Sequence, residues 1–259
     1  MFCVLKGIRV RVLARNPQSL SEFSTHPLIT IIKGDALKPS DVEKLITSDV
    51  DGVFCALGVG KNEPTNVVAD GTRNALQAMR KLIKPMHYVL VTSHGTIESD
   101  NWFYNNIIRK HLLNHIYDDL KNAEDIVQQV ANNDPNITFS VVRPPQLSDT
   151  PLTMDYTIGV GFEMAKGKDI LAREDVADCM IRCMFGKYDL GHYNLDTTNK
   201  CISLNSNRSI KADPVLVVMK KVLPTRQWYT LQFIFWLGFT SISTAAFFSG
   251  KYLWNRFNK

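Results

Sequence analysis

Short runs of mainly apolar residues recur along the first 150 residues, with segments of helical spacing between them. The first run, 8–13 (IRVRVL), alternates apolar and basic residues, as a strand near a sheet edge would. The runs are four to six residues long and rich in β-branched residues, so they predict β-strands over 8–13, 29–32, 52–57, 88–92 and 138–142. Helices are predicted over 39–46, 66–83 and 105–131. Strands without polar alternation are buried on both faces. This favours an α/β fold with a doubly wound, mainly parallel, Rossmann-like sheet.

The C-terminal part of the chain follows a different pattern. Residues 228–250 (WYTLQFIFWLGFTSISTAAFFSG) carry no charge. As a helix they would reach roughly 34 Å, enough to cross a hydrocarbon core of about 30 Å. The sequence therefore predicts a basic linker over 211–227, a transmembrane helix over 228–250 and a basic tail over 251–259. A buried or interfacial amphipathic helix is the alternative, because the segment is less apolar than the most hydrophobic spans.

Charge separates the two parts of the chain. The net charge is +5, and residues 211–259 hold seven Lys or Arg against one Asp. Residues 1–210 are left with 23 basic and 24 acidic side chains, so this domain offers no excess of positive charge for nucleic acid. The lipid bilayer is the partner that this distribution favours. We expect a single-pass membrane protein with its large domain, residues 1–210, on the cytosolic side.

The residue types that hold metals or form disulfides give little signal. The chain has five cysteines and no C-x-x-C, which favours reduced, buried thiols. His111 and His115 lie four residues apart, but no third ligand is evident, so no metal site is predicted.

Polar residues, glycine and proline directly follow the predicted strands, at Arg15, Asp35, Gly58, Ser93 and 144–146. In a parallel sheet, ligands bind in the crevice at the carboxyl ends of the strands. An arginine there can pair with a phosphate, which favours NADP over NAD, and Asp35 could accept a hydrogen bond from an adenine amino group. Taken singly, each of these residues fits an ordinary loop or turn equally well.

Several segments resemble the atypical short-chain dehydrogenase/reductases, and within them the NADPH-dependent flavin reductase (biliverdin reductase B) type. They are VLARNPQSL (12–20), KGDALKPSDVEKLI (33–46), DGVFCALG (51–58), PTNVVADGTRNALQAMRK (64–81), VLVTSHG (89–95), VVRPPQLSDTPLTMDYTI (141–158) and LAREDVADCMIRCM (171–184). The resemblance implies a Rossmann-type fold that binds NADP and passes hydride to a flavin or tetrapyrrole.

The same resemblance implies roles for individual residues. Arg15 would hold the 2′-phosphate, Asp35 and Ala36 the adenine, and Gly58 the adenosine side. The site is completed by Ser93 near the nicotinamide and by Pro144, Pro145 and Gln146, which would line the cofactor and substrate side.

The chain departs from this family in two places. No G-x-x-G-x-x-G occurs, and residues 1–7 resemble the end of the helix that follows such a turn, so the first strand and the pyrophosphate cradle are missing. Strands 8–13 and 52–57 should then face a gap unless they pair with each other. In addition, Gln146 stands where the flavin reductase has a histidine, and glutamine cannot carry a proton at neutral pH. A truncated form with a normal turn upstream is one explanation of the first departure.

Tyr117 and Lys121 form a Y-x-x-x-K pair on the helix after Ser93. Residues four apart share a helix face, so the ammonium could lower the tyrosine pKa while Ser93 orients a carbonyl. Decoration of a helix surface is the alternative. The sequence thus predicts a membrane-anchored, NADP-dependent oxidoreductase acting on a flavin-like or carbonyl acceptor. A non-catalytic membrane-tethered module, or a truncated isoform with impaired cofactor binding, is the other possibility.

Overall fold

The computed structural model describes residues 7–96, 106, 109–111, 113–160, 170–185 and 196–206 of the 259-residue chain. No helix in these ranges is long and apolar enough to cross a bilayer. The linker, the transmembrane helix over 228–250 and the basic tail lie outside the described residues, so they stay predictions.

A five-stranded sheet forms the centre of the described domain. Its order is β3 (Gly52–Cys55), β4 (Met86–Val91), β5 (Ile137–Arg143), β9 (Lys200–Ser206) and β7 (Tyr156–Val160). The strands β3, β4, β5 and β9 run parallel, and only β7 is antiparallel. The predicted α/β class with a mainly parallel sheet is confirmed.

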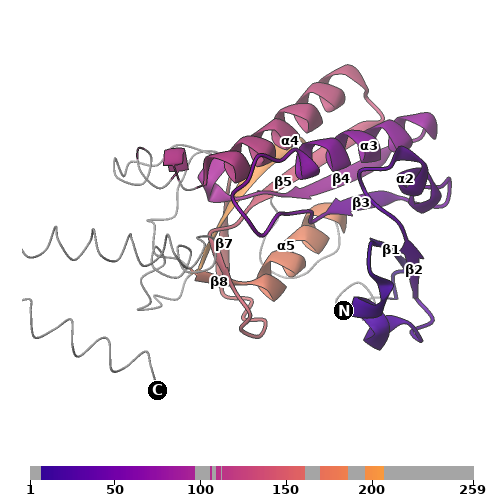
Figure 1. The fold of residues 1–259 in the computed structure, drawn as a ribbon, viewed down its shortest axis with the longest axis horizontal. Helices are drawn as coiled ribbons and strands as arrows, with labels where there is room; N and C mark the ends of the chain where they lie inside the picture. Colours follow the sequence, from indigo (N-terminus) through magenta and orange to yellow (C-terminus); the bar gives the residue numbers. More distant parts are fainter. Residues whose placement is uncertain are drawn as a thin grey trace, which may run out of the picture. The chain divides into compact units, whose positions relative to one another are not determined.

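Helices cover both faces of this sheet. In Figure 1, α3 (Val67–Lys81) and α4 (Asn114–Asn133) lie on one side and α5 (Arg173–Phe185) on the other. Consecutive strand residues point to opposite faces, so Leu90 joins the core under α3 and α4 while Val89 joins the core under α5. Both side chains are fully buried. This explains why β4 and β5 are mainly apolar.

The sheet is split where the sequence predicts a gap. The strands β1 (Val10–Ala14) and β2 (Ile29–Lys33) form a separate parallel pair. Among the described residues, no strand pairs with the second edge of β1 or of β3. The two strands therefore do not close on each other, and their outer backbone groups have no ladder partner in this part of the chain.

Side chains and one short helix join the β1–β2 pair to the rest of the domain. Val42, on α2 (Pro39–Leu45), is buried in the core that α3 covers. Arg11 on β1 pairs with Asp49 before β3, with 2.7 Å between Nη2 and Oδ2. Asn74 on α3 donates through Nδ2 to the carbonyl oxygen of Ala36 at 2.9 Å.

The remaining elements differ from the sequence prediction. The long helix expected over 105–131 is regular from Asn114 onward as α4. The strands β7 and β9 were not expected, nor was the short parallel pair of β6 (Gln146–Ser148) and β8 (Ile170–Ala172). Two 3₁₀ helices, η1 (Pro17–Phe23), which is kinked at Leu20, and η2 (His94–Thr96), complete the described part.

Candidate functional site

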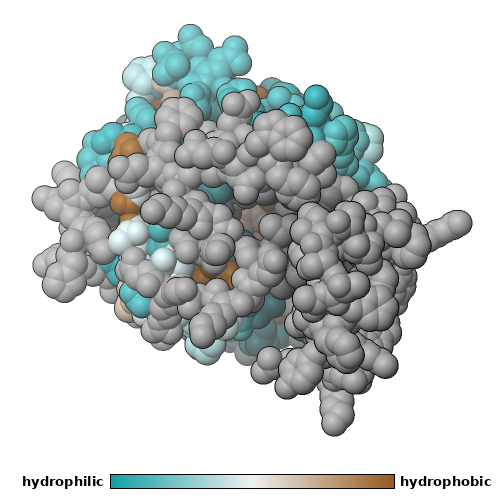
Figure 2. All heavy atoms as spheres, turned by 90° about the vertical axis from the view of Figure 1, so that its left-hand side faces the viewer, coloured by the Kyte–Doolittle hydropathy of each residue, from teal (hydrophilic) through white to brown (hydrophobic). Residues whose placement is uncertain are grey.

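The carboxyl ends of β4 and β5 are joined beyond the strands themselves. The Thr92 amide donates to the carbonyl oxygen of Val142 at 2.9 Å, and the His94 amide donates to that of Pro144 at 3.0 Å. The turn that carries Ser93 therefore lies against the Pro-Pro segment. Figure 2 shows the side of the molecule that lies to the left in Figure 1, where α4 begins. On this side, hydrophobic and hydrophilic residues of the described part of the chain lie next to one another.

Hydrogen bonds within the turn fix Ser93. Its Oγ accepts the Gly95 amide at 3.2 Å, and its carbonyl oxygen accepts the Thr96 hydroxyl at 2.9 Å. Arg109 donates to the carbonyl oxygens of Gly95 and Thr96 at 3.1 and 3.4 Å. The half-buried Ser93 hydroxyl keeps its proton to donate to a ligand.

A buried ion pair supports the turn from below. Glu124 on α4 is fully buried and accepts from Arg143 Nη2 at 2.6 Å and Nε at 3.0 Å. The same carboxylate accepts the hydroxyls of Thr92 and Thr96 at 2.7 and 3.1 Å. Burial alone lowers the pKa of Arg143, but the hydrogen bond and charge of Glu124 raise that pKa above its ordinary value. Both ends of the Ser93 turn are thus tied to one charged pair.

Tyr117 lies over the same turn. A Cβ built on Gly95 would fall 2.5 Å from Tyr117 Oη and nearer still to the ring, so only glycine fits beneath it. The Tyr117 ring therefore lies against Gly95, two residues after Ser93. Lys121 forms an ion pair with Asp125, one turn further along α4. Its ammonium is thereby engaged with a carboxylate.

Arg15, Asp35 and Ala36 lie together at the carboxyl end of the other sheet, where the Gly34 amide donates to the carbonyl oxygen of Ala14 at 3.1 Å. Arg15 is exposed. Asp35 Oδ1 accepts the Leu37 amide at 3.0 Å in a turn that leads into α2. These three predicted residues are on the β1–β2 pair, whereas Ser93 and Pro144 belong to the five-stranded sheet.

The residues present fit one half of a dinucleotide better than the other. An exposed arginine beside a partly exposed aspartate suits an adenosine 2′-phosphate and an adenine. A Cβ atom added to Gly58 would meet no other atom within 4 Å, so a ligand has room to approach the backbone there. A diphosphate usually needs backbone N–H groups at a helix start. At the start of α3, the amides of Val68 and Ala69 donate to Asp119 at 3.0 and 2.9 Å, so a carboxylate already occupies this position.

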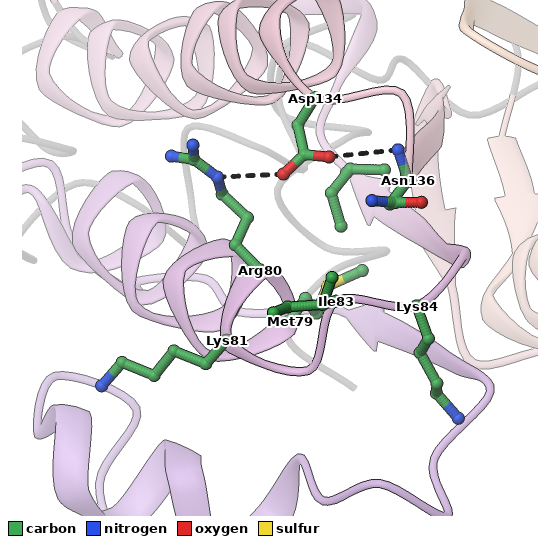
Figure 3. Close-up of a pocket in the computed structure, with 8 residues that line it drawn as sticks. Met79, Arg80, Lys81, Ile83, Lys84, Asp134 and Asn136 are labelled. Carbon is green, nitrogen blue, oxygen red and sulfur yellow. Dashed lines mark hydrogen bonds and ion pairs between the residues drawn. The ribbon is translucent and has the colours of Figure 1, made fainter.

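A hollow in the surface lies at the opposite end of the sheet. It has a volume of about 340 Å³ and is lined by Met79, Arg80, Lys81, Ile83, Lys84, Asp134, Asn136 and Ile137 (Figure 3). Arg80 pairs with Asp134 at 3.1 Å and Lys84 donates to the carbonyl oxygen of Ser48 at 2.8 Å. Because its charges are engaged and it lies at the amino ends of β4 and β5, we assign it no part in the chemistry.

Sequence reasoning missed His94, which follows Ser93 and is only 9% exposed. Burial, together with the positive charge of Arg143, lowers the pKa of His94 to about 4. Burial also lowers the pKa of His87, near the amino end of β4, to about 4. The signal available in the sequence was the position of His94 directly behind a predicted strand.

These two histidines predict acid sensitivity of the fold. An unfolded imidazole takes up its proton near pH 6.5, whereas the folded protein resists protonation until about pH 4. Between these values the unfolded chain binds more protons, so the free energy of unfolding falls as the pH is lowered. We expect a loss of about 1–2 kcal/mol for each histidine between pH 7 and pH 5. Urea unfolding of the wild type and of His87→Asn measures it, and an unchanged pH slope in the variant would contradict the assignment.

Comparison with known protein families now identifies the class. A profile described as NAD(P)H-binding matches residues 4–186. The match covers more than half of the chain, so this protein belongs to the NAD(P)H-binding family.

Solved structures share the fold at low sequence identity. A short-chain dehydrogenase/reductase from Veillonella parvula, solved in complex with NADP, is 14% identical with a TM-score of 0.62, covering 80% of this chain and 88% of that one. The anaerobillin reductase ChuY from Escherichia coli O157:H7 is 17% identical with a TM-score of 0.60, covering 82% and 91%. A Streptococcus pneumoniae protein, provisionally described as an NADH-flavin reductase, is 15% identical with a TM-score of 0.55, covering 80% and 91%. The resemblance to reductases of this superfamily is thereby confirmed at the level of fold.

Proposed function

We propose that this protein is an NADPH-dependent reductase of a flat, conjugated or carbonyl acceptor. NADPH supplies a hydride to the acceptor, and a proton from solvent or from a protein hydroxyl completes the reduction. The observation that carries the proposal is the fixed junction of the Ser93 turn with Pro144, over which Tyr117 lies. The flavin and anaerobillin reductases among the structural neighbours support a flavin-like or tetrapyrrole acceptor.

In this proposal the residues of the β1–β2 pair bind the adenosine half of the cofactor. Arg15 pairs with the 2′-phosphate through its guanidinium, which favours NADP over NAD. Asp35 and Ala36 border the adenine, and Gly58 lets the ligand approach the backbone. Pro145 borders the cofactor from the other side.

The five-stranded sheet provides the reacting end. The Ser93 hydroxyl donates a hydrogen bond to the nicotinamide amide or to the acceptor, and Pro144 and Gln146 line the acceptor side. Tyr117, which lies against Gly95, is the candidate proton donor if the acceptor is a carbonyl. Lys121 could assist Tyr117 only after its ion pair with Asp125 is broken. This ion pair therefore weakens the case for Lys121 as a catalytic residue.

One observation favours a second function. The helix start that could receive a diphosphate is occupied by Asp119, and no strand among the described residues pairs with the second edge of β1 or of β3. A non-catalytic module that keeps the outline of the fold is consistent with this arrangement. A measurement of cofactor binding distinguishes the two functions, because only the reductase requires NADPH.

Titration of the full chain with NADPH and with NADH, followed by nicotinamide fluorescence, tests the proposal. We expect micromolar binding of NADPH. Arg15→Met should weaken the binding of NADPH roughly ten- to hundredfold and leave the binding of NADH unchanged, because only NADPH carries the 2′-phosphate. Arg9→Met, an exposed arginine before β1, is the matched control. Absence of NADPH binding up to millimolar concentration would leave the non-catalytic function.

The membrane span is a separate proposal, based on the sequence of 228–250. We expect the full chain to stay in the membrane pellet when cells expressing it are extracted with alkaline carbonate. A chain ending at residue 227 should move to the supernatant. Release of the full chain would refute a spanning helix and favour the interfacial alternative.

A further inference from the structure

Four buried side-chain atoms among the described residues have no hydrogen-bond partner: His94 Nε2, Gln146 Oε1, Ser203 Oγ and Asn205 Oδ1. They come from the turn after β4, from the start of β6 just after β5, and from β9. Ser203 stands opposite Arg143, the last residue of β5, and Asn205 is two residues further along β9. Buried polar atoms without partners cost roughly 1–3 kcal/mol each and are rare in folded proteins. Their concentration at one end of the sheet indicates a polar ligand there.

His94 offers a neutral donor to such a ligand. Its backbone is fixed, because its amide donates to the carbonyl oxygen of Pro144 at 3.0 Å. Only 9% of the residue is exposed. With a pKa near 4 the ring is uncharged at neutral pH, so in its Nε2–H tautomer it donates one hydrogen bond.

Gln146 offers the complementary acceptor. It begins β6, two residues after the Pro144 that binds the His94 backbone. Its Oε1 can only accept. Two adjoining segments thus present one donor and one acceptor, both uncharged. A ligand that satisfies both carries a carbonyl oxygen beside an N–H, and a charged group is disfavoured at a buried position of this kind.

We propose that His94 and Gln146 recognise the acceptor by pairing with a cyclic –CO–NH– edge, its carbonyl oxygen on His94 Nε2 and its N–H on Gln146 Oε1. This inference rests on the proposed reductase function and names the residues that select its substrate. The imide of a flavin and the lactam of a bilin share this edge. A quinone accepts hydride but has no N–H, so the pair would not select it.

Equilibrium binding to the full chain, with no nucleotide present, tests the edge directly. Riboflavin should bind about tenfold more tightly than 3-methylriboflavin, whose imide N–H is blocked; this corresponds to about 1.4 kcal/mol. Biliverdin, titrated by absorbance, shows whether a lactam is preferred to an imide. Equal affinity of riboflavin and its methyl derivative would overturn the proposal, as would failure of both riboflavin and biliverdin to bind.

Two variants separate recognition from a structural role. His94→Leu and Gln146→Met should leave the free energy of unfolding unchanged or higher, because each removes an unpaired buried polar atom. Both variants should bind riboflavin about tenfold more weakly than the wild type does. In addition, Gln146→Met should abolish the difference in affinity between riboflavin and 3-methylriboflavin. His87→Asn, toward the other end of β4, is the control that should keep that difference. Variants that are less stable but bind riboflavin normally would overturn the proposal.

Measurements with NADPH and with the quinone menadione distinguish failure of the reductase function from failure of the proposed edge recognition. The wild type should bind NADPH and oxidise it with menadione, because a quinone needs no –CO–NH– edge to accept hydride. If the wild type binds no NADPH, the reductase function fails. The nucleotide-free comparison of riboflavin with 3-methylriboflavin still decides whether His94 and Gln146 bind the edge.

Discussion

Replacing Arg143 by methionine should lower the free energy of unfolding by roughly 3–5 kcal/mol, because Glu124 would remain buried with a charge and no counter-ion. Glu124 is fully enclosed, and Arg143 provides two of its four hydrogen bonds. Urea unfolding of the full chain measures the loss. The Ser93 turn should loosen as well, since Thr92 and Thr96 bind the same carboxylate.

A surface arginine provides the matched control. Arg80→Met breaks the pair with Asp134, but the Arg80 side chain is 53% exposed, so the loss should stay below about 1 kcal/mol. The double variant Arg143→Met, Glu124→Gln should recover part of the stability, because a neutral amide still accepts the threonine hydroxyls. If Arg143→Met and Arg80→Met lose the same small amount, the buried pair does not stabilise the domain as argued.

Asp175→Ala should cost roughly 2–4 kcal/mol and release the segment that follows β6. Asp175 is fully buried in the first turn of α5 and accepts three hydrogen bonds, each of 2.8 Å, from the Thr153 amide, the Thr153 hydroxyl and the Met154 amide. Each hydrogen bond to an ionised group contributes more than a neutral one. These bonds also hold Met154 at a φ of +54°, a left-handed conformation that non-glycine residues avoid.

Urea unfolding and limited proteolysis of this segment measure the effect. Glu174→Ala is the control, because Glu174 is exposed, stands next to Asp175 and accepts the Leu152 amide from the same segment at 2.8 Å. It should cost less than about 1 kcal/mol. Faster cleavage in Asp175→Ala but not in Glu174→Ala is the expected pattern, and equal cleavage would contradict it.

The sequence predicted the sheet best where the strands are buried on both faces. The segments that became β4 and β5 are mainly apolar and mostly buried, and both were expected. The strand β9 alternates instead, with Ile202 and Leu204 buried between polar neighbours, and β7 contains a glycine and a threonine. Their pairing depends on residues that are distant in sequence, which local periodicity does not report.

The sequence predicted Ser93 and Tyr117 as site residues, and the structure places the Tyr117 ring against Gly95, two residues after Ser93. The catalytic roles of Ser93 and Tyr117 stay predictions. Glu124 was not expected, because a glutamate within an amphipathic helix usually faces solvent. Only its partner Arg143, on a strand far along the chain, makes its burial possible. The ion pair of Lys121 with Asp125 likewise depends on side-chain conformations that spacing alone leaves open.

The split between β1 and β3 has a consequence for local opening of the domain. In a continuous sheet, backbone hydrogen bonds couple every strand to the next, and the strands tend to open together. Here the β1–β2 pair is attached through α2, Arg11 and Asn74, so it can detach without breaking a ladder of the larger sheet. Amide protons of β1 and β2 should therefore exchange with deuterium well before those of β4 and β5, as a separate cooperative unit. Since Arg15 and Asp35 are on that unit, a nucleotide that binds them would slow the exchange of β1 and β2.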